Sequence, residues 1–250
     1  MPSLASDGAY CPAVRIRTIL PTLAVLAFAG SALAASSGTV STTLTPNKVG
    51  KASTLSISAT GPFSFTGLPK SAELLVQKGF KSSPKSVSVL CSSAQLAANN
   101  CPSKSKIGSG TAKATGTLGA FSEQDTIALT LYLGARQKPS DIASVDVIGQ
   151  DSLFNATLHG SGRLFKSNGA LELLFSQFPT PSNIPQGTKV TLDSLSLSAG
   201  ASRTVKKHKH KVHYALIKNP PTCSGNWTGT FTLTFSNGTF TKALSTACKS

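Results

Sequence analysis

Polar and apolar residues alternate along most of the chain after residue 40. Clear examples are the segments 54–58, 127–133, 190–197 and 230–235, where apolar side chains take alternate positions and Ser or Thr fill most of the others. A period of two places successive side chains on opposite faces of an extended strand, so each segment has one face to bury. The pattern predicts about a dozen short β-strands.

Turn-forming residues separate these strands. Asn168-Gly169 and Asn237-Gly238 each lie between two strand-like runs. Asn-Gly is the preferred pair in two-residue hairpin turns, because both central residues take a positive φ. We therefore expect hairpins around 165–171 and 235–240, and antiparallel pairing between their strands.

The frequent turns and the scarcity of helix predict an all-β fold, an antiparallel β-sandwich built as one large unit or as two small units in tandem. The segment 78–106, rich in Lys and Ser, is where two units would divide. The best helix candidate is 92–98, a short turn that Ser92 or Ser93 could cap. It is expected to be a loop element with no role in the scaffold.

Residues 1–34 have the features of a secretory signal peptide. Arg15 and Arg17 precede an apolar run, and Ala32-Leu33-Ala34 supplies the small residues that a signal peptidase reads. Nothing later in the chain is apolar enough to span a membrane, so we expect no transmembrane segment after the signal is removed. The sequence predicts a product that is extracellular or associated with the cell envelope.

Four cysteines follow the predicted signal: Cys91, Cys101, Cys223 and Cys248. An even number in an exported chain indicates two disulfides, for which three pairings exist. We expect the local pairing Cys91–Cys101 and Cys223–Cys248, because each pair brackets one short unit. The alternatives, a thiol nucleophile or a zinc site, lack a C-x-x-C motif and any zinc-ligand spacing. No cofactor is expected.

Three motifs follow one another along the chain: Leu44-Thr-Pro-Asn-Lys-Val-Gly-Lys51, Cys91 followed by Cys101-Pro102 with Ser105-Lys-Ile-Gly-Ser-Gly110, and Pro220-Pro-Thr-Cys223-Ser-Gly-Asn-Trp227. Together they resemble a group of secreted actinobacterial proteins that are mostly uncharacterised. The resemblance spans most of the chain after the signal. It implies a disulfide-bonded β-sandwich at or outside the cell surface, and it implies no catalytic residues.

The chain is strongly basic, with 24 Lys and Arg against 9 Asp and Glu and a formal charge of +15. The most basic segment is 203–213, which contains Arg203, Lys206, Lys207, His208, Lys209, His210, Lys211 and His213. Two interpretations stay open: a solvated hairpin tip between strands 192–197 and 214–217, or a patch for acidic cell-envelope polymers. Metal binding by His208, His210 and His213 is a third, which the neighbouring lysines oppose.

Motifs for other functions are sparse. The histidine outside the basic segment is His159, and Gly160-Ser161-Gly162 does not have the spacing of a nucleophile elbow. The carboxylates form no hydrolase or calcium motif, so Asp141, Asp146 and Asp151 are expected as turn and edge charges. Aromatic residues are too few for a carbohydrate platform or for specific binding of nucleic acid.

We therefore expect a non-enzymatic structural or interaction protein, secreted or associated with the envelope. Two alternatives remain: a binder of anionic envelope polymers through 203–213, and a hydrolase whose site no motif reveals.

Overall fold

The computed structural model describes residues 38–63, 65, 67–151, 156–178 and 186–250. The predicted signal peptide, 1–34, lies outside these ranges. None of the helices in the described part of the chain is long and apolar enough to cross a membrane.

Thirteen strands, one short α-helix and two turns of 3-10 helix make up the described fold. In chain order they are β1 (Thr39–Thr45), β2 (Thr54–Thr60), β3 (Ser71–Lys78), η1 (Pro84–Ser86), α1 (Ser93–Ala97), η2 (Ser103–Ser105), β4 (Lys106–Leu118), β5 (Phe121–Gly134), β6 (Asp141–Asp151), β7 (Ala156–Ser167), β8 (Ala170–Phe175), β9 (Lys189–Ala199), β10 (Ser202–Lys207), β11 (His210–Ala215), β12 (Asn226–Phe235) and β13 (Gly238–Ala247).

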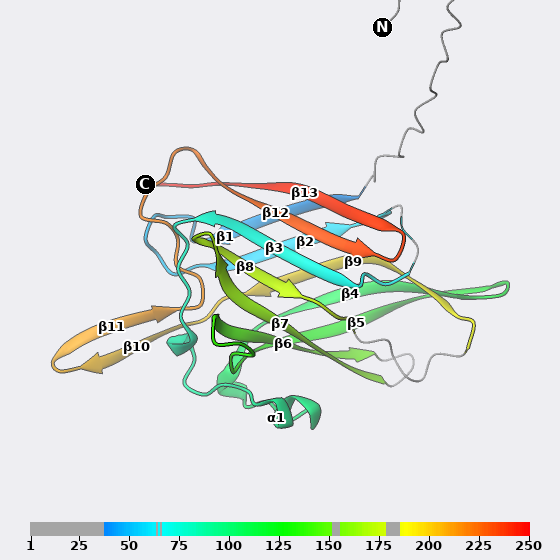
Figure 1. The fold of residues 1–250 in the computed structure, drawn as a ribbon, viewed down its shortest axis with the longest axis horizontal. Coiled ribbons are helices and arrows are strands. Elements are labelled where there is room, and N and C mark those ends of the chain that lie inside the picture. Colours follow the sequence, from blue (N-terminus) through cyan, green and yellow to red (C-terminus); the bar gives the residue numbers. More distant parts are fainter. Residues whose placement is uncertain (1–37, 64, 66, 152–155, 179–185) are drawn as a thin grey trace, which may run out of the picture. The chain divides into compact units, whose positions relative to one another are not determined.

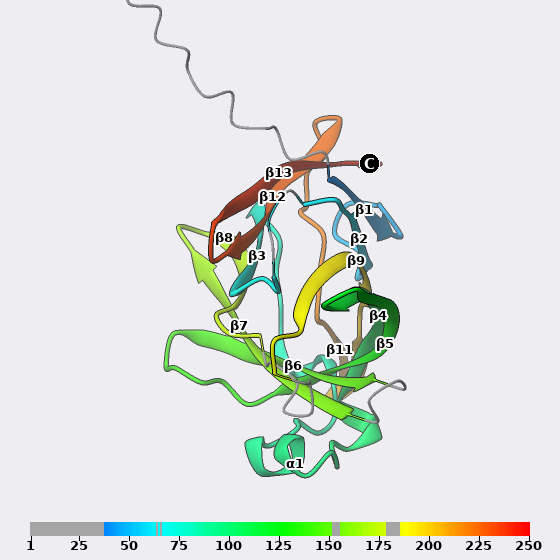
Figure 2. The ribbon, with the colours of Figure 1, turned by 90° about the vertical axis from the view of Figure 1, so that its right-hand side faces the viewer.

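Eleven of these strands form one antiparallel sheet, in the order β1-β2-β9-β4-β5-β6-β7-β8-β3-β12-β13 (Figure 1). Figure 2 shows the strands following one another around a common interior. The two edge strands nearly meet, since the hydroxyls of Thr42 on β1 and Thr246 on β13 lie 2.9 Å apart in a hydrogen bond. The all-β antiparallel fold is thus confirmed, and the facing layers of the expected sandwich are parts of one curled sheet.

Pairing across the segment 78–106 shows how the scaffold is assembled. β3 ends at Lys78 and β4 begins at Lys106, yet both belong to the same sheet. β3 pairs with β8 and β12, while β4 pairs with β5 and β9. Of the two arrangements that the sequence left open, the structure has the single large unit.

The Asn-Gly signals correctly predict both hairpins. Asn168 and Gly169 have φ values of 50° and 83° and form the two-residue turn between β7 and β8. In the β12–β13 hairpin, Phe235 pairs with Gly238. The turn there is centred one residue earlier than the Asn-Gly pair, on Ser236 and Asn237, and the glycine begins the strand.

Two disulfides join the predicted pairs, Cys91–Cys101 and Cys223–Cys248. The first encloses α1, whose N-terminus is capped as expected: the Ser92 hydroxyl accepts from the Gln95 N–H, and the Gln95 side chain accepts from the Ser92 N–H.

Candidate functional site

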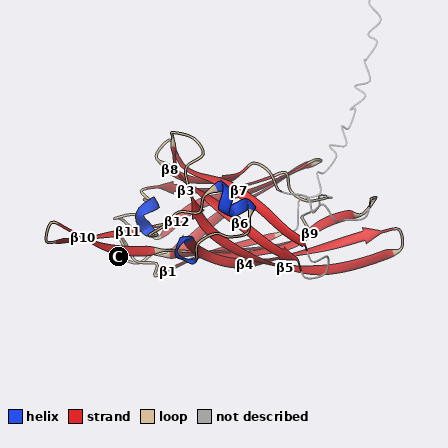
Figure 3. Ribbon diagram, turned by 90° about the horizontal axis from the view of Figure 1, so that it is seen from below, coloured by secondary structure: helices blue, strands red, loops and turns tan. Residues whose placement is uncertain are grey.

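The basic segment forms a hairpin of its own. Among the described strands, β10 and β11 pair only with each other, and they project from one end of the large sheet (Figures 1 and 3). One interpretation of the sequence made this segment a solvated hairpin tip between strands 192–197 and 214–217. In the structure the turn itself consists of His208 and Lys209, and the flanking lysines lie on the two strands of the hairpin.

The hairpin register places basic residues opposite one another. Lys206 lies directly opposite Lys211, and Lys207 lies opposite His210, and all four are exposed. Opposed like charges destabilise a strand pair. The ion pair found within the described part of the chain joins Arg163 and Asp141. The hairpin lysines therefore have no acidic partner among the described residues.

The base of the hairpin is anchored. Arg203 Nη1 donates to the Val87 carbonyl at 3.5 Å, and Lys85 lies over the ring of Tyr214, 5.6 Å from its centroid. On the other face, His213 Nδ1 lies 3.0 Å from the Thr204 hydroxyl. His208, with a φ of 43°, lies in the turn and not in an extended strand, so strand alternation does not place it on the same side as His210. The described residues contain no group of three metal-ligating side chains.

A second feature is an apolar cavity of about 370 Å³ inside the large sheet. Its walls come from strands β2 to β9 and β12, and they carry mainly Leu, Ile, Val, Ala and Phe side chains, among them Ile57, Leu129, Leu158, Phe175, Leu192 and Leu233. A smaller space of about 80 Å³ shares Leu74 and Leu173 with it. The larger volume falls within the range of small-molecule sites.

Small residues keep this space open. Ala112, Ala114 and Gly116 occupy successive inward positions of β4, and Gly149 and Gly160 line the cavity from β6 and β7. Inward positions of a closed sheet are ordinarily filled by large apolar side chains to the density of a protein interior. Here the small side chains leave the volume unfilled.

The β4–β5 hairpin forms the mouth of the cavity. Leu118 and Phe121 flank its turn and also line the cavity, although they are 41% and 83% exposed. Residues that are both exposed and part of the wall mark the opening. Figures 1 and 3 place this hairpin at the end of the sheet opposite the basic β10–β11 hairpin.

Carboxyl groups lie just inside the mouth. Glu123, Asp125 and Asp151 all line the cavity, and they are exposed, half-buried and buried respectively. Burial raises the pKa of Asp125 above its ordinary value, and a hydrogen bond with the Asp151 carboxyl and the charge of Glu123 raise it further. The Thr126 N–H donates to Asp125 at 2.7 Å and acts in the opposite direction.

The expected turn and edge positions of three β6 aspartates are wrong. Asp141, Asp146 and Asp151 are all buried members of β6. Asp141 accepts hydrogen bonds from Arg163, with Nη2 2.6 Å from Oδ1. Asp146 accepts from the Ser161 hydroxyl, and its burial raises its pKa even though hydrogen bonds from Ser161 and Ser144 oppose the shift. The five-residue spacing of the aspartates could not reveal these partners, because Arg163 and Ser161 lie on a different strand, β7.

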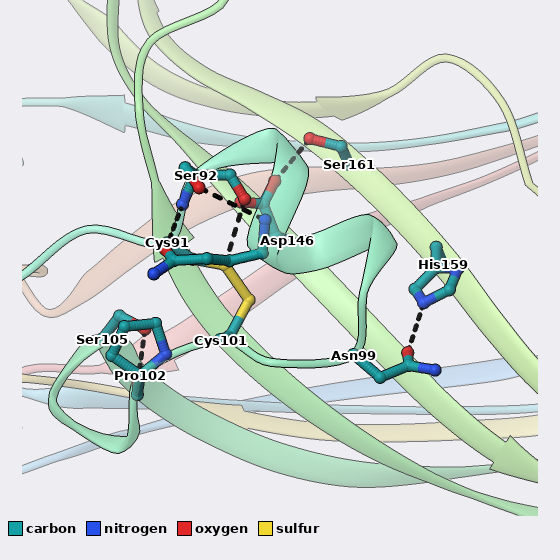
Figure 4. Close-up of a disulfide and its surroundings, with 10 residues drawn as sticks. Cys91, Ser92, Asn99, Cys101, Pro102, Ser105, Asp146, His159 and Ser161 are labelled. Atoms are coloured by element: carbon teal, nitrogen blue, oxygen red, sulfur yellow. Dashed lines mark hydrogen bonds between the residues drawn. A yellow bond between two sulfur atoms is a disulfide. The ribbon is translucent and has the colours of Figure 1, made fainter.

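The arrangement around His159 does not form a Ser-His-Asp relay. Figure 4 shows His159 directed at Asn99, in the loop closed by the Cys91–Cys101 disulfide, and Ser161 directed at Asp146. The serine hydroxyl therefore donates to a carboxylate, whereas a nucleophilic serine would donate to the imidazole. His159 does not line the large cavity, within the described residues.

The cavity and its carboxyls are the features that sequence reasoning missed. A signal existed in 106–118, where Ala112, Ala114 and Gly116 take the positions that Leu or Val would take in an ordinary half-buried strand. The residues that face them are distant in sequence, so the volume could not be foreseen from this strand alone. No protein family, curated protein or solved structure matches the chain.

Proposed function

We propose that this protein is a secreted, non-enzymatic binding protein that holds an apolar small molecule inside its sheet. The observation that carries the proposal is the cavity of about 370 Å³, apolar along its walls and open at Leu118 and Phe121. An unfilled apolar interior loses dispersion contacts that larger side chains would supply. A ligand would restore those contacts and remove its own apolar surface from water.

The two disulfides and the Ser- and Thr-rich strands support an extracellular place of work. In that setting the protein would carry or retain a poorly soluble compound. The antiparallel wall and the exposed mouth fit a role in which the ligand is bound and is not chemically changed.

The test is to fill the cavity with one side chain. Ala114→Leu places a larger group on the inward face of β4, where Ala114 is buried and lines the cavity. Ala128→Leu makes the same change on β5, at an exposed position outside the cavity lining. Binding of decanol by the full-length chain, followed by calorimetry, should be lost in Ala114→Leu and kept in Ala128→Leu. Equal binding by both variants, or no binding by the unaltered protein, would overturn the proposal.

A specific observation favours a second function, adhesion to acidic envelope polymers through the β10–β11 hairpin. Lys206 and Lys211 are opposed and exposed, and an anionic group between them would relieve their repulsion. Because the hairpin and the cavity mouth lie at opposite ends of the sheet, the protein could adhere through one and bind through the other.

Adhesion is tested by retention on immobilised dextran sulfate over a salt series. The variant changes Lys206, Lys207, Lys209 and Lys211 to Ser, and the control changes four exposed lysines elsewhere, Lys51, Lys70, Lys104 and Lys113, to Ser. Both variants lose the same charge. Salt-sensitive retention should fall much further in the hairpin variant. An equal fall in both would show that net charge alone acts and that the hairpin is a solubilising element.

A further inference from the structure

The large cavity is long and narrow. On β5 its lining begins with Phe121, beside the mouth, and continues through alternate residues to Leu129. A strand rises about 3.3 Å per residue, so the stretch 121–129 covers about 26 Å. Strands in a barrel tilt by about 35–45° from its axis, so the cavity extends about 20 Å along that axis. A volume of about 370 Å³ over this length gives the space the shape of a channel.

The smaller space of about 80 Å³ continues this channel away from the mouth. Along β5 the larger cavity ends at Leu129, and the next inward residue, Leu131, lines the smaller space. Along β6, Val147 lines the larger space and Val145 lines the smaller one. β4 and β7 show the same order. The two spaces therefore lie end to end.

Leu74 and Leu173 separate the two spaces. They are the residues that line both, and they pair directly with each other across β3 and β8. Paired residues on adjacent strands point to the same face of the sheet, with Cβ atoms about 4.5–5.5 Å apart. The neighbouring wall of the larger cavity, at Leu129 and Val147, is also apolar. The two leucines thus form an apolar inner end of the channel, and the smaller space lies beyond them.

We propose that the ligand of this cavity carries one unbranched hydrocarbon chain, which lies along the channel, and that Leu74 and Leu173 set the longest chain that fits. This inference rests on the proposed function and defines the shape of the ligand. The polar end of the ligand stays in water at Leu118 and Phe121, because a polar group that is buried without a hydrogen bond costs free energy. The methyl end reaches the two leucines. A compact ring system with the same number of carbons is too wide for the channel.

The first experiment compares decanol with 1-adamantanol, which has the same ten carbons and one hydroxyl in a compact cage. Calorimetry with the full-length chain should show decanol binding at least tenfold more tightly. Equal affinities would overturn this inference while the proposed function stands. Failure of both alcohols to bind would overturn the proposed function and this inference with it.

The second experiment measures where the channel ends. The probes are saturated lysophosphatidylcholines with chains of 10–18 carbons, each below its micelle concentration, and their bulky head group stays at the mouth. Affinity should rise by up to about fourfold for each added CH₂ group and stop rising once the chain reaches the two leucines. An even rise through the whole series would contradict the proposed inner end.

Leu74→Ala joins the smaller space to the channel, so its affinity should continue to rise at chain lengths where the unaltered protein has reached its limit. Leu129→Ala is the matched control. It removes the same atoms from the wall of the larger cavity, but Leu129 does not line the smaller space, so the limit should stay where it was. The same shift in both variants would show that Leu74 does not set the length. If Leu74→Ala does not fold, the limit found with the unaltered protein still tests the proposal.

Discussion

Gly134 on β5 lies so close to the carboxyl group of Asp146 on β6, the adjacent strand, that residue 134 has no room for a Cβ atom. A Cβ added to Gly134 would overlap Oδ2 of Asp146 and Oγ of Ser144. Cys91 also pairs with Gly134 at this point, and its N–H donates to the Leu133 carbonyl at 2.9 Å. The absence of a side chain at residue 134 thus allows the disulfide loop to lie close over the sheet and the carboxylate to be buried beneath it.

We predict that Gly134→Ala lowers the free energy of unfolding by about 1–3 kcal/mol, as overpacking typically does. The measurement is urea unfolding monitored by circular dichroism. Gly160→Ala is the control, since a Cβ there would meet only Val147 Cβ, at 3.9 Å. A similar loss in both variants would mean that the overlap with Asp146 and Ser144 is not its cause.

Asp141 and Arg163 give a prediction with a defined pH dependence. The hydrogen bonds from Arg163 hold the pKa of Asp141 below its ordinary value, against the effect of burial, with help from the Lys138 N–H. A carboxyl whose folded pKa is depressed contributes stability above its unfolded pKa, near 4, and loses it as pH falls through the folded value.

Asp141→Asn should therefore be less stable than the unaltered protein at pH 7, and the difference should shrink as pH falls below about 4. Urea unfolding at a series of pH values tests this. Asp193→Asn, whose partners Thr115 and Gln124 are neutral, serves for comparison. A stability difference for Asp141→Asn that stays constant down to pH 2.5 would contradict the assigned role of its charge.

Much of the local structure could be predicted from sequence because its causes are local. The Asn168-Gly169 turn needs two positive φ values, and the pair Cys91–Cys101 closes a loop with a sequence separation of only 10 residues. The position of β3 between β8 and β12, by contrast, depends on pairings over long sequence separations. Alternation shows that a strand has an inner face but does not show which strand lies beside it.

The candidate site illustrates the same limit. Asp146 and Asp151 are five residues apart on one strand, so they point to opposite faces, one under the disulfide loop and one into the cavity. Their charge suggested exposure, but the side chains that they contact, Ser161 and Asp125, come from other strands. The basic segment was recognised because its charges are contiguous, whereas the cavity is assembled from single residues on many strands.

The turn of the basic hairpin has a backbone conformation that disfavours its sequence. Lys209 has a φ of 72°, in the left-handed region where residues with a Cβ are disfavoured by about 1–2 kcal/mol. Lys209→Gly should relieve this and slow amide hydrogen exchange within 202–215 about fivefold, the change that 1 kcal/mol produces. Lys206→Gly, within the regular strand β10, should accelerate exchange. If both variants accelerate exchange, the turn is not strained.

Asp125 should affect stability with the opposite sign to Asp141. Its pKa is raised by burial, by the hydrogen bond with Asp151 and by the charge of Glu123, so the folded protein binds a proton there more tightly than the unfolded chain does. The stability linked to this group is fully present below the unfolded pKa, near 4, and is lost as pH rises through the higher folded value. Asp125→Asn removes the charge while keeping the shape. It should match the unaltered protein at pH 3 and exceed its stability at pH 7, whereas Asp141→Asn falls below it at pH 7. Urea midpoints across pH 3–8 distinguish the two variants. If Asp125→Asn is the less stable protein at neutral pH, its carboxylate is compensated by groups within the fold.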